Sequence, residues 1–186
     1  QRYNFSVMMI TRHKHIYSIW KRCVKDLAIL SAVIAVYIYI ATTIAGICIK
    51  RKIYNWEDEA STCYSAIHMP CEAAPSFALI SEVFILQAFA VIFVMGLIML
   101  AVWWITDKKW AGYLAAMVIV SVEYYDADGA ISTGLLWRKY VMTYSVYKKG
   151  ILLGKNILMP IAVCIAVLLV TSLIVRLKKK EFINSR

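Results

Sequence analysis

The chain alternates between long runs of apolar residues and shorter polar segments. The last run, residues 157–175, contains nineteen residues without a charge and is followed directly by Arg176 and by Lys178, Lys179 and Lys180. A helix of that length, at about 1.5 Å per residue, just crosses roughly 30 Å of hydrocarbon. Because a helix satisfies its own backbone hydrogen bonds inside lipid, this run predicts a transmembrane helix.

Three earlier runs predict three more spans. Residues 27–49 are uncharged, and residues 77–105 are interrupted only by Glu82 and Gln87. Residues 110–125 are apolar only as far as Val122, so this span is long enough only if its last three residues extend the helix into the headgroups. The pattern therefore predicts an all-α, polytopic membrane protein with four spans, in which residues 1–186 form a single transmembrane domain.

The distribution of Lys and Arg predicts how the spans are oriented. Of 21 basic residues, thirteen fall in segments 1–26, 106–109 and 176–186, and the other eight fall in the longer segments 50–76 and 126–156. Basic residues near a span are retained in the cytoplasm. We therefore expect a multi-pass protein of the plasma membrane with both termini cytoplasmic and with 50–76 and 126–156 as outer loops. Lys50, Arg51 and Lys52 argue against this orientation, but the basic residues of segment 1–26 outnumber them.

Segment 1–26 has its own amphipathic pattern. Ile16, Ile19, Trp20 and Val24 recur at helical spacing among cations. This pattern suits a helix that lies on the inner membrane surface, with Trp20 at headgroup level and its cations toward anionic lipids. The alternative is a basic flank that only sets the orientation of the first span.

Composition supports a membrane protein over a soluble one. The chain is 62% hydrophobic and 17% charged, whereas soluble domains carry about 45–50% apolar and about 25% charged residues. A net charge of +10 would indicate nucleic acid or anionic lipid as the partner of a soluble protein. Here most cations flank apolar runs, and no motif of a nucleic-acid reader is present, so we expect no nucleic-acid partner.

Few polar residues fall inside the predicted spans. Glu82 is a possible intramembrane polar site, because an acidic group in a membrane helix is costly and often functional. The alternative is that Glu82 lies at headgroup depth and is solvated. Gln87 lies about 140° further round the helix, so the two do not share one face cleanly. The small residues Ala41, Ala45 and Gly46 would permit close approach of another helix.

The five cysteines suggest a disulfide more than a catalytic role. Cys63 and Cys71 share the first predicted outer loop, where they form a disulfide or remain free thiols. A metal site with His68 would match no compact zinc spacing. A Cys71 nucleophile would need a base held within hydrogen-bond reach, for which the sequence gives no sign. No phosphate-binding Gly-rich loop is present. We therefore expect neither an enzyme nor a bound cofactor or metal.

Three stretches together resemble a known family. The basic, Trp-containing segment 11–26 leads directly into a span, the sequence Trp-Trp-Ile-Thr-Asp-Lys-Lys-Trp at 103–110 joins two spans, and the last span runs into the basic segment 176–183. This pattern resembles the small permease subunits of ATP-binding-cassette exporters that Gram-positive bacteria use for antimicrobial peptides, immunity or lipids. Such a subunit would export a peptide or lipid-like substrate.

The resemblance implies roles for particular segments. Segment 1–26 would be an elbow helix, and a turn would contact a separate ATPase subunit, which hydrolyses the ATP; the turn consists of Thr106, Asp107, Lys108, Lys109 and Trp110. Membrane subunits would assemble as a homo- or hetero-oligomer around the path. Because family members typically have more spans than the four predicted here, an alternative is a non-transporting accessory, immunity or regulatory protein that binds a peptide or partner through its outer loops. A small channel and an intramembrane enzyme are further alternatives.

Overall fold

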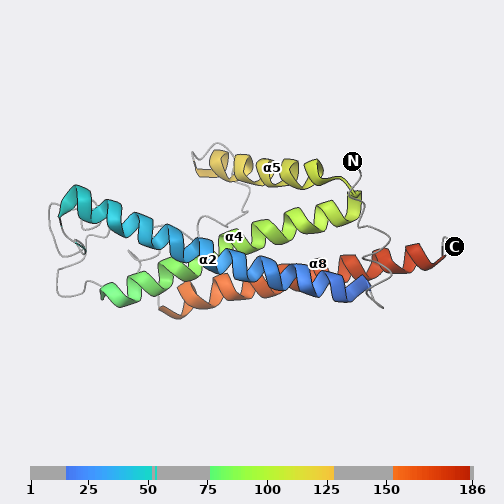
Figure 1. Ribbon diagram of the computed structural model, residues 1–186, viewed down its shortest axis with the longest axis horizontal. Coiled ribbons are helices and arrows are strands. Elements are labelled where there is room, and N and C mark those ends of the chain that lie inside the picture. Colours follow the sequence, from blue (N-terminus) through green and yellow to red (C-terminus); the bar gives the residue numbers. More distant parts are fainter. Residues whose placement is uncertain (1–15, 52, 54–75, 128–152, 185–186) are drawn as a thin grey trace.

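The protein is a bundle of long helices. The computed structural model describes residues 16–51, 53, 76–127 and 153–184, and within these ranges all regular structure is helical. The elements are α2 (Ile16–Lys50), α4 (Phe77–Thr106), α5 (Lys109–Ala127) and α8 (Leu153–Asn184) (Figure 1). Three stretches are long and apolar enough to cross a membrane: Tyr17–Ile49, Phe77–Thr106 and Pro160–Leu177. The prediction of an all-α, polytopic membrane protein is confirmed.

Helix α2 joins the predicted surface segment to the first span. Residues 16–26 belong to the same uninterrupted helix as residues 27–49, so the described part of the expected elbow is not set off by a turn. The physical reason is that no Gly or Pro, which break helices, occurs between Ile16 and Ala45. The helix ends at Lys50 because Arg51 adopts a left-handed φ of 55° and its N–H donates to the carbonyl of Ile47 at 2.8 Å.

Helix α4 is the central element. It begins after Ser76, whose Oγ accepts a hydrogen bond from the backbone N–H of Leu79, and it packs against α2, α5 and α8. In their most apolar stretches, 39% of the residues of α4 are buried, against 11% in α2 and 17% in α8. Much of the surface of the other two long helices is therefore available to lipid.

The core lies where three helices meet. It consists of Trp20 from α2, Phe93, Leu97 and Ala101 from α4, and Val175 from α8. The chain order places this core at the end of the bundle where α2 begins and α8 ends (Figure 1). Because lipid is as apolar as these side chains, helix association here depends on close packing and on hydrogen bonds between helices.

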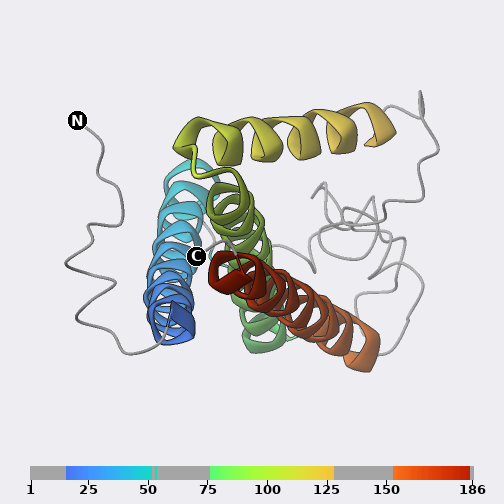
Figure 2. The same ribbon diagram turned by 90° about the vertical axis from the view of Figure 1, so that its right-hand side faces the viewer.

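Helix α5 leaves the bundle obliquely. Figure 2 views the molecule along its long axis. In this view α2, α4 and α8 are strongly foreshortened, whereas α5 extends across the picture. Near the turn its backbone comes close to α4, since a Cβ on Gly112 would lie 2.6 Å from the carbonyl oxygen of Met99. Helix α5 contains the predicted third span, but its apolar part, Lys109–Val122, is shorter than that of the other three.

Of the three small residues predicted to permit close approach on α2, Gly46 has no such neighbour among the described residues. No described atom lies within 4 Å of a Cβ built on Gly46. Helix α2 instead meets α4 at Gly96, where an added Cβ would lie 2.6 Å from a methyl group of Leu27. A small residue of α4, Gly96, therefore lies where these two helices are in close contact.

Hydroxyl groups in the apolar helices bond mostly to their own backbone. The Oγ of Ser31 donates to the carbonyl of Leu27 at 2.8 Å, and the Oγ1 of Thr171 donates to that of Val167 at 2.8 Å. These bonds satisfy hydroxyls that have no water to bind inside lipid. A bond between side chains also joins α2 to α4, because the Tyr39 hydroxyl donates to the Oγ of Ser81 at 2.8 Å.

Candidate functional site

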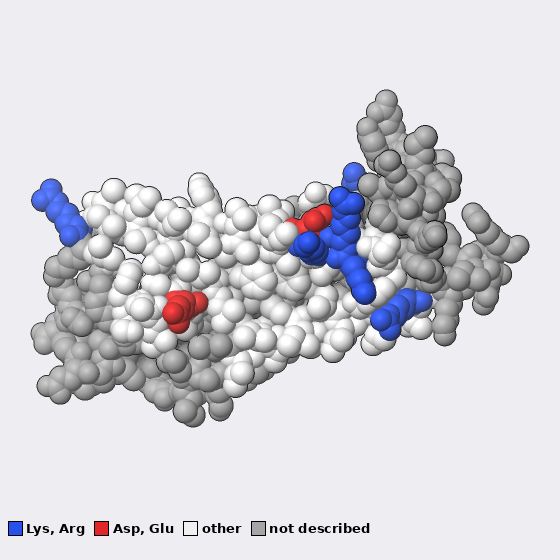
Figure 3. All heavy atoms as spheres, turned by 60° about the horizontal axis from the view of Figure 1, so that its bottom comes forward, with Lys and Arg blue, Asp and Glu red and all other residues white. Residues whose placement is uncertain are grey.

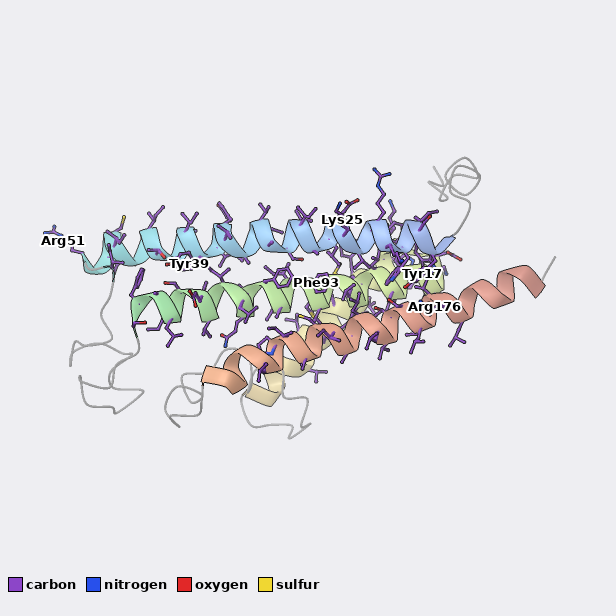
Figure 4. The ribbon with its side chains drawn as sticks, turned by 90° about the horizontal axis from the view of Figure 1, so that it is seen from below. Tyr17, Lys25, Tyr39, Arg51, Phe93 and Arg176 are labelled. Atoms are coloured by element: carbon purple, nitrogen blue, oxygen red, sulfur yellow. The ribbon has the colours of Figure 1, made fainter. Side chains whose placement is uncertain are left out.

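Positive charge gathers at one end of the bundle, which we call the basic end. The chain directions bring the start of α2, the α4–α5 turn and the end of α8 to this end (Figure 1). Six cations whose side chains are described belong to it: Lys21, Arg22 and Lys25 of α2, Lys108 and Lys109 at the turn, and Arg176 of α8. On the face shown in Figure 3, the blue side chains cluster toward one side, apart from a single group at the far left. Arg51 lies at the opposite end from Tyr17 and Arg176 (Figure 4).

The cations of the basic end stack on aromatic rings. The Nζ of Lys21 lies 5.0 Å and the Cζ of Arg176 lies 4.8 Å from the centroid of Tyr17. At the turn, the Nζ of Lys108 lies 5.7 Å from the ring of Trp110, and the Nζ of Lys109 lies 5.5 Å from that of Trp103. Such contacts hold a cation beside a ring without neutralising its charge.

Tyr17 joins α2 to α8. Besides stacking on the ring, Arg176 donates from Nη2 to the Tyr17 hydroxyl at 3.3 Å. One aromatic ring therefore holds two cations, one from its own helix and one from a helix that follows much later in the chain. Among the residues whose side chains are described, the carboxylates at this end are Asp26 and Asp107, and none of the six cations forms an ion pair with a described carboxylate.

Trp20 makes the second link between α2 and α8. Its Nε1 donates to the Oγ of Ser172 at 3.3 Å, and its ring packs edge-on against Trp104 of α4 with centroids 5.7 Å apart. Trp20 is only 1% exposed. Figures 2 and 4 agree that α8 lies near α2 at this end and departs from it toward the other.

The turn that the sequence singled out, Thr106–Trp110, is tight and exposed. Asp107 has a left-handed φ of 56°, and its N–H donates to the carbonyl of Trp103 at 2.8 Å. The Oγ1 of Thr106 donates to the carbonyl of Val102 at 2.8 Å and accepts from the N–H of Lys108 at 3.3 Å. All five residues of the turn are exposed. The backbone bonds fix its shape while its side chains face outward.

Glu82 and Gln87 do not form one site. Glu82 is exposed near the start of α4, whereas Gln87 is buried on another face of that helix, with 6% of its surface exposed. The Gln87 side chain makes no hydrogen bond within the described part of the protein. The two residues therefore do not act together through direct contact.

The predicted cysteine pair, Cys63 and Cys71, lies outside the described residues, as does His68. Cys23, Cys48 and Cys164 are free thiols on the helices. Across the described ranges, no group of three or more His, Cys, Asp or Glu residues could hold a metal ion.

Sequence reasoning missed the contacts that tie α2 to α8. It placed Trp20 at headgroup level and gave no sign that Trp20 and Tyr17 bond to partners 152 and 159 residues away in the chain. The only local signal was an aromatic residue within a basic segment. No protein family, characterised protein or solved structure matches this chain.

Proposed function

We propose that the chain is a membrane-spanning subunit of an ATP-binding-cassette transporter, and that a separate ATPase subunit docks on the turn Thr106–Trp110. The observation that carries this proposal is the turn itself, whose backbone is fixed by hydrogen bonds while its side chains are exposed. A partner that binds there would engage a surface of constant shape carrying two exposed cations.

The turn is also well connected to the rest of the bundle. It ends α4, and the last turns of α4 carry Ala101 and Trp104, which pack against Trp20 of α2. A displacement of the turn would therefore move the helix that contacts α2, α5 and α8. This connection suits a coupling element, since packed helices transmit motion as rigid bodies.

The distribution of charge supports an orientation in the plasma membrane with the basic end in the cytoplasm. With that orientation the turn faces the compartment where ATP is available. Both ends of the described chain, at the start of α2 and the end of α8, would lie on the same side.

Several copies or subunits would enclose the path for the substrate. A single chain offers three long apolar helices, of which α2 and α8 are mostly unburied. Its core, in contrast, is filled by side chains such as Leu97, which is 0% exposed. We therefore propose a homo- or hetero-oligomer of membrane subunits that exports a peptide or lipid-like substrate, with ATP hydrolysis in the partner.

A pull-down of the tagged chain from its native host in mild detergent tests the proposal. We expect a stoichiometric ATPase subunit in the eluate, identified by mass spectrometry. Lys108→Glu combined with Lys109→Glu should remove it, because both cations are exposed on the turn. Arg51→Glu is the matched control, since it reverses an exposed cation at the opposite end and should retain the ATPase. A wild-type eluate without any ATPase would refute the transporter assignment.

A second candidate function rests on the number of long helices. Three helices are long and apolar enough to cross a membrane, with α5 shorter, and this small number favours a non-transporting accessory, immunity or regulatory protein beside a larger permease. For that function the eluate should contain a polytopic membrane partner. The partner should remain bound after charge reversal at Lys108 and Lys109.

A further inference from the structure

The basic end also has the chemistry of a lipid site. We propose that Lys21 and Arg176, held on either side of the α2–α8 contact by Tyr17, bind the phosphate of an anionic phospholipid. This inference goes beyond the proposed function, because it concerns the bilayer around the chain and does not depend on whether an ATPase docks on the turn.

Lys21 and Arg176 place two positive charges beside one aromatic ring. Lys21 and Arg176 stack on the same ring, at 5.0 and 4.8 Å from its centroid, although they come from different helices. Both side chains are exposed, and neither forms an ion pair with a described carboxylate. Like charges held this close repel each other, and an anion that contacts both removes that repulsion.

The second step is depth in the membrane. Tyrosine and tryptophan side chains concentrate at the level of the lipid headgroups. Tyr17, Trp103 and Trp110 all stack with cations at this end, so the cations are held at that same level. A lipid phosphate lies at this depth and is complementary in charge.

The third step is the apolar surface next to the cations. Leu173 and Leu169 precede Arg176 by about one and two turns of α8, and they are 57% and 59% exposed. On α2, Ile29 lies about two turns after Lys21 and about 80° further round the helix, and it is 54% exposed. Acyl chains can cover these side chains while the headgroup contacts the cations, an arrangement that a free phosphate compound would not use.

Native mass spectrometry of the purified chain, titrated with phosphatidylglycerol or phosphatidylcholine, tests the proposal without any ATPase present. We expect the wild type to prefer phosphatidylglycerol. Lys21→Gln combined with Arg176→Gln should weaken phosphatidylglycerol binding by about tenfold to thirtyfold, since each interfacial cation is worth about 1 kcal/mol. Arg51→Gln, at the opposite end, should leave the preference unchanged.

Lys21→Gln alone keeps the bond between Arg176 and Tyr17, so it tests the site even if the double variant fails to fold. It should weaken binding by about fivefold. Equal binding of both lipids by the wild type would overturn the proposal. An acidic protein surface would then be the ligand of these cations instead. Equal losses in Lys21→Gln and Arg51→Gln would also overturn it. Displacement of the lipid by excess inorganic phosphate would identify the ligand as a soluble phosphate compound instead.

Discussion

Two glycines of the apolar helices stand in opposite surroundings. A Cβ on Gly112 would lie 2.6 Å from the backbone carbonyl oxygen of Met99, whereas no described atom lies within 4 Å of one on Gly46. We expect Gly112→Ala to destabilise the protein by about 1–3 kcal/mol, because a backbone atom cannot move away as a side chain can. The measurement is the free energy of unfolding in a mixed-micelle titration.

The matched control for this prediction is Gly46→Ala. The added methyl group projects from α2 where it contacts no described atom. The free energy of unfolding should therefore stay unchanged or rise by no more than about 1 kcal/mol. Equal effects at the two positions would mean that α4 and α5 are not in close contact at Gly112.

Trp20 combines burial with a polar link to another helix. Trp20→Phe removes the indole N–H that donates to Ser172 and leaves a gap beside Trp104. We expect a loss of about 1–3 kcal/mol, the sum of one hydrogen bond in lipid and the lost packing. Trp110→Phe, at a position 61% exposed, should change stability by less than about 0.5 kcal/mol. Thermal melting in detergent compares the two, and similar melting temperatures would contradict the burial of Trp20.

At the scale of helices, a hydrogen bond between side chains joins α2 to α4, from the Tyr39 hydroxyl to the Oγ of Ser81. Tyr39→Phe should cost only about 0.6 kcal/mol, because hydrogen bonds between membrane helices are weak on average. The Oγ of Ser81 also keeps its bond to the carbonyl of Phe77. Tyr37→Phe, at a position 70% exposed, is the control and should have no effect on the free energy of unfolding. A loss above about 2 kcal/mol at Tyr39 would contradict this interpretation.

The helices themselves were predictable because each apolar run must become a helix if it enters lipid. The first and last residues of the helices were less predictable. A hydrophobic pattern ends where charge begins, but a helix continues until its backbone is stopped. This is why α2 extends back to Ile16 through a basic segment and α8 extends forward to Asn184. The stop at Lys50 depends on the conformation of Arg51, a residue type that gives no sign of a left-handed φ.

The candidate site was predictable only where it is local. The turn Thr106–Trp110 could be read from a short polar segment between two apolar runs. The pairing of Tyr17 with Arg176 could not, because it depends on how α2 and α8 are rotated and crossed. The same rotation exposes Glu82 and buries Gln87 on α4. A sequence pattern gives the angle between two residues of one helix but not the direction in which a neighbouring helix lies.

At the scale of the whole molecule, the short helix α5 decides on which side the following segment lies. Its nineteen residues span about 28 Å if it crosses the membrane directly. In a chain whose native cysteines have been replaced, we expect Ala127→Cys, at the last residue of α5, to react with an impermeant maleimide added outside intact cells. Lys108→Cys, at the other end of α5, should react only after the cells are lysed. Labelling of both from the same side would show that α5 does not cross, and would leave three spans.

The bond between Trp20 and Ser172 has a consequence for how the protein is made. The two residues are 152 positions apart, and synthesis proceeds at about 5–20 residues per second, so about 8–30 s separate their appearance. During that interval Ser172, the hydrogen-bond partner of Trp20, and Val175, its neighbour in the core, do not yet exist. The basic end is therefore the last part of the described bundle to be completed, and a chain that stops before residue 172 leaves Trp20 without the partner that its indole N–H has in the finished protein.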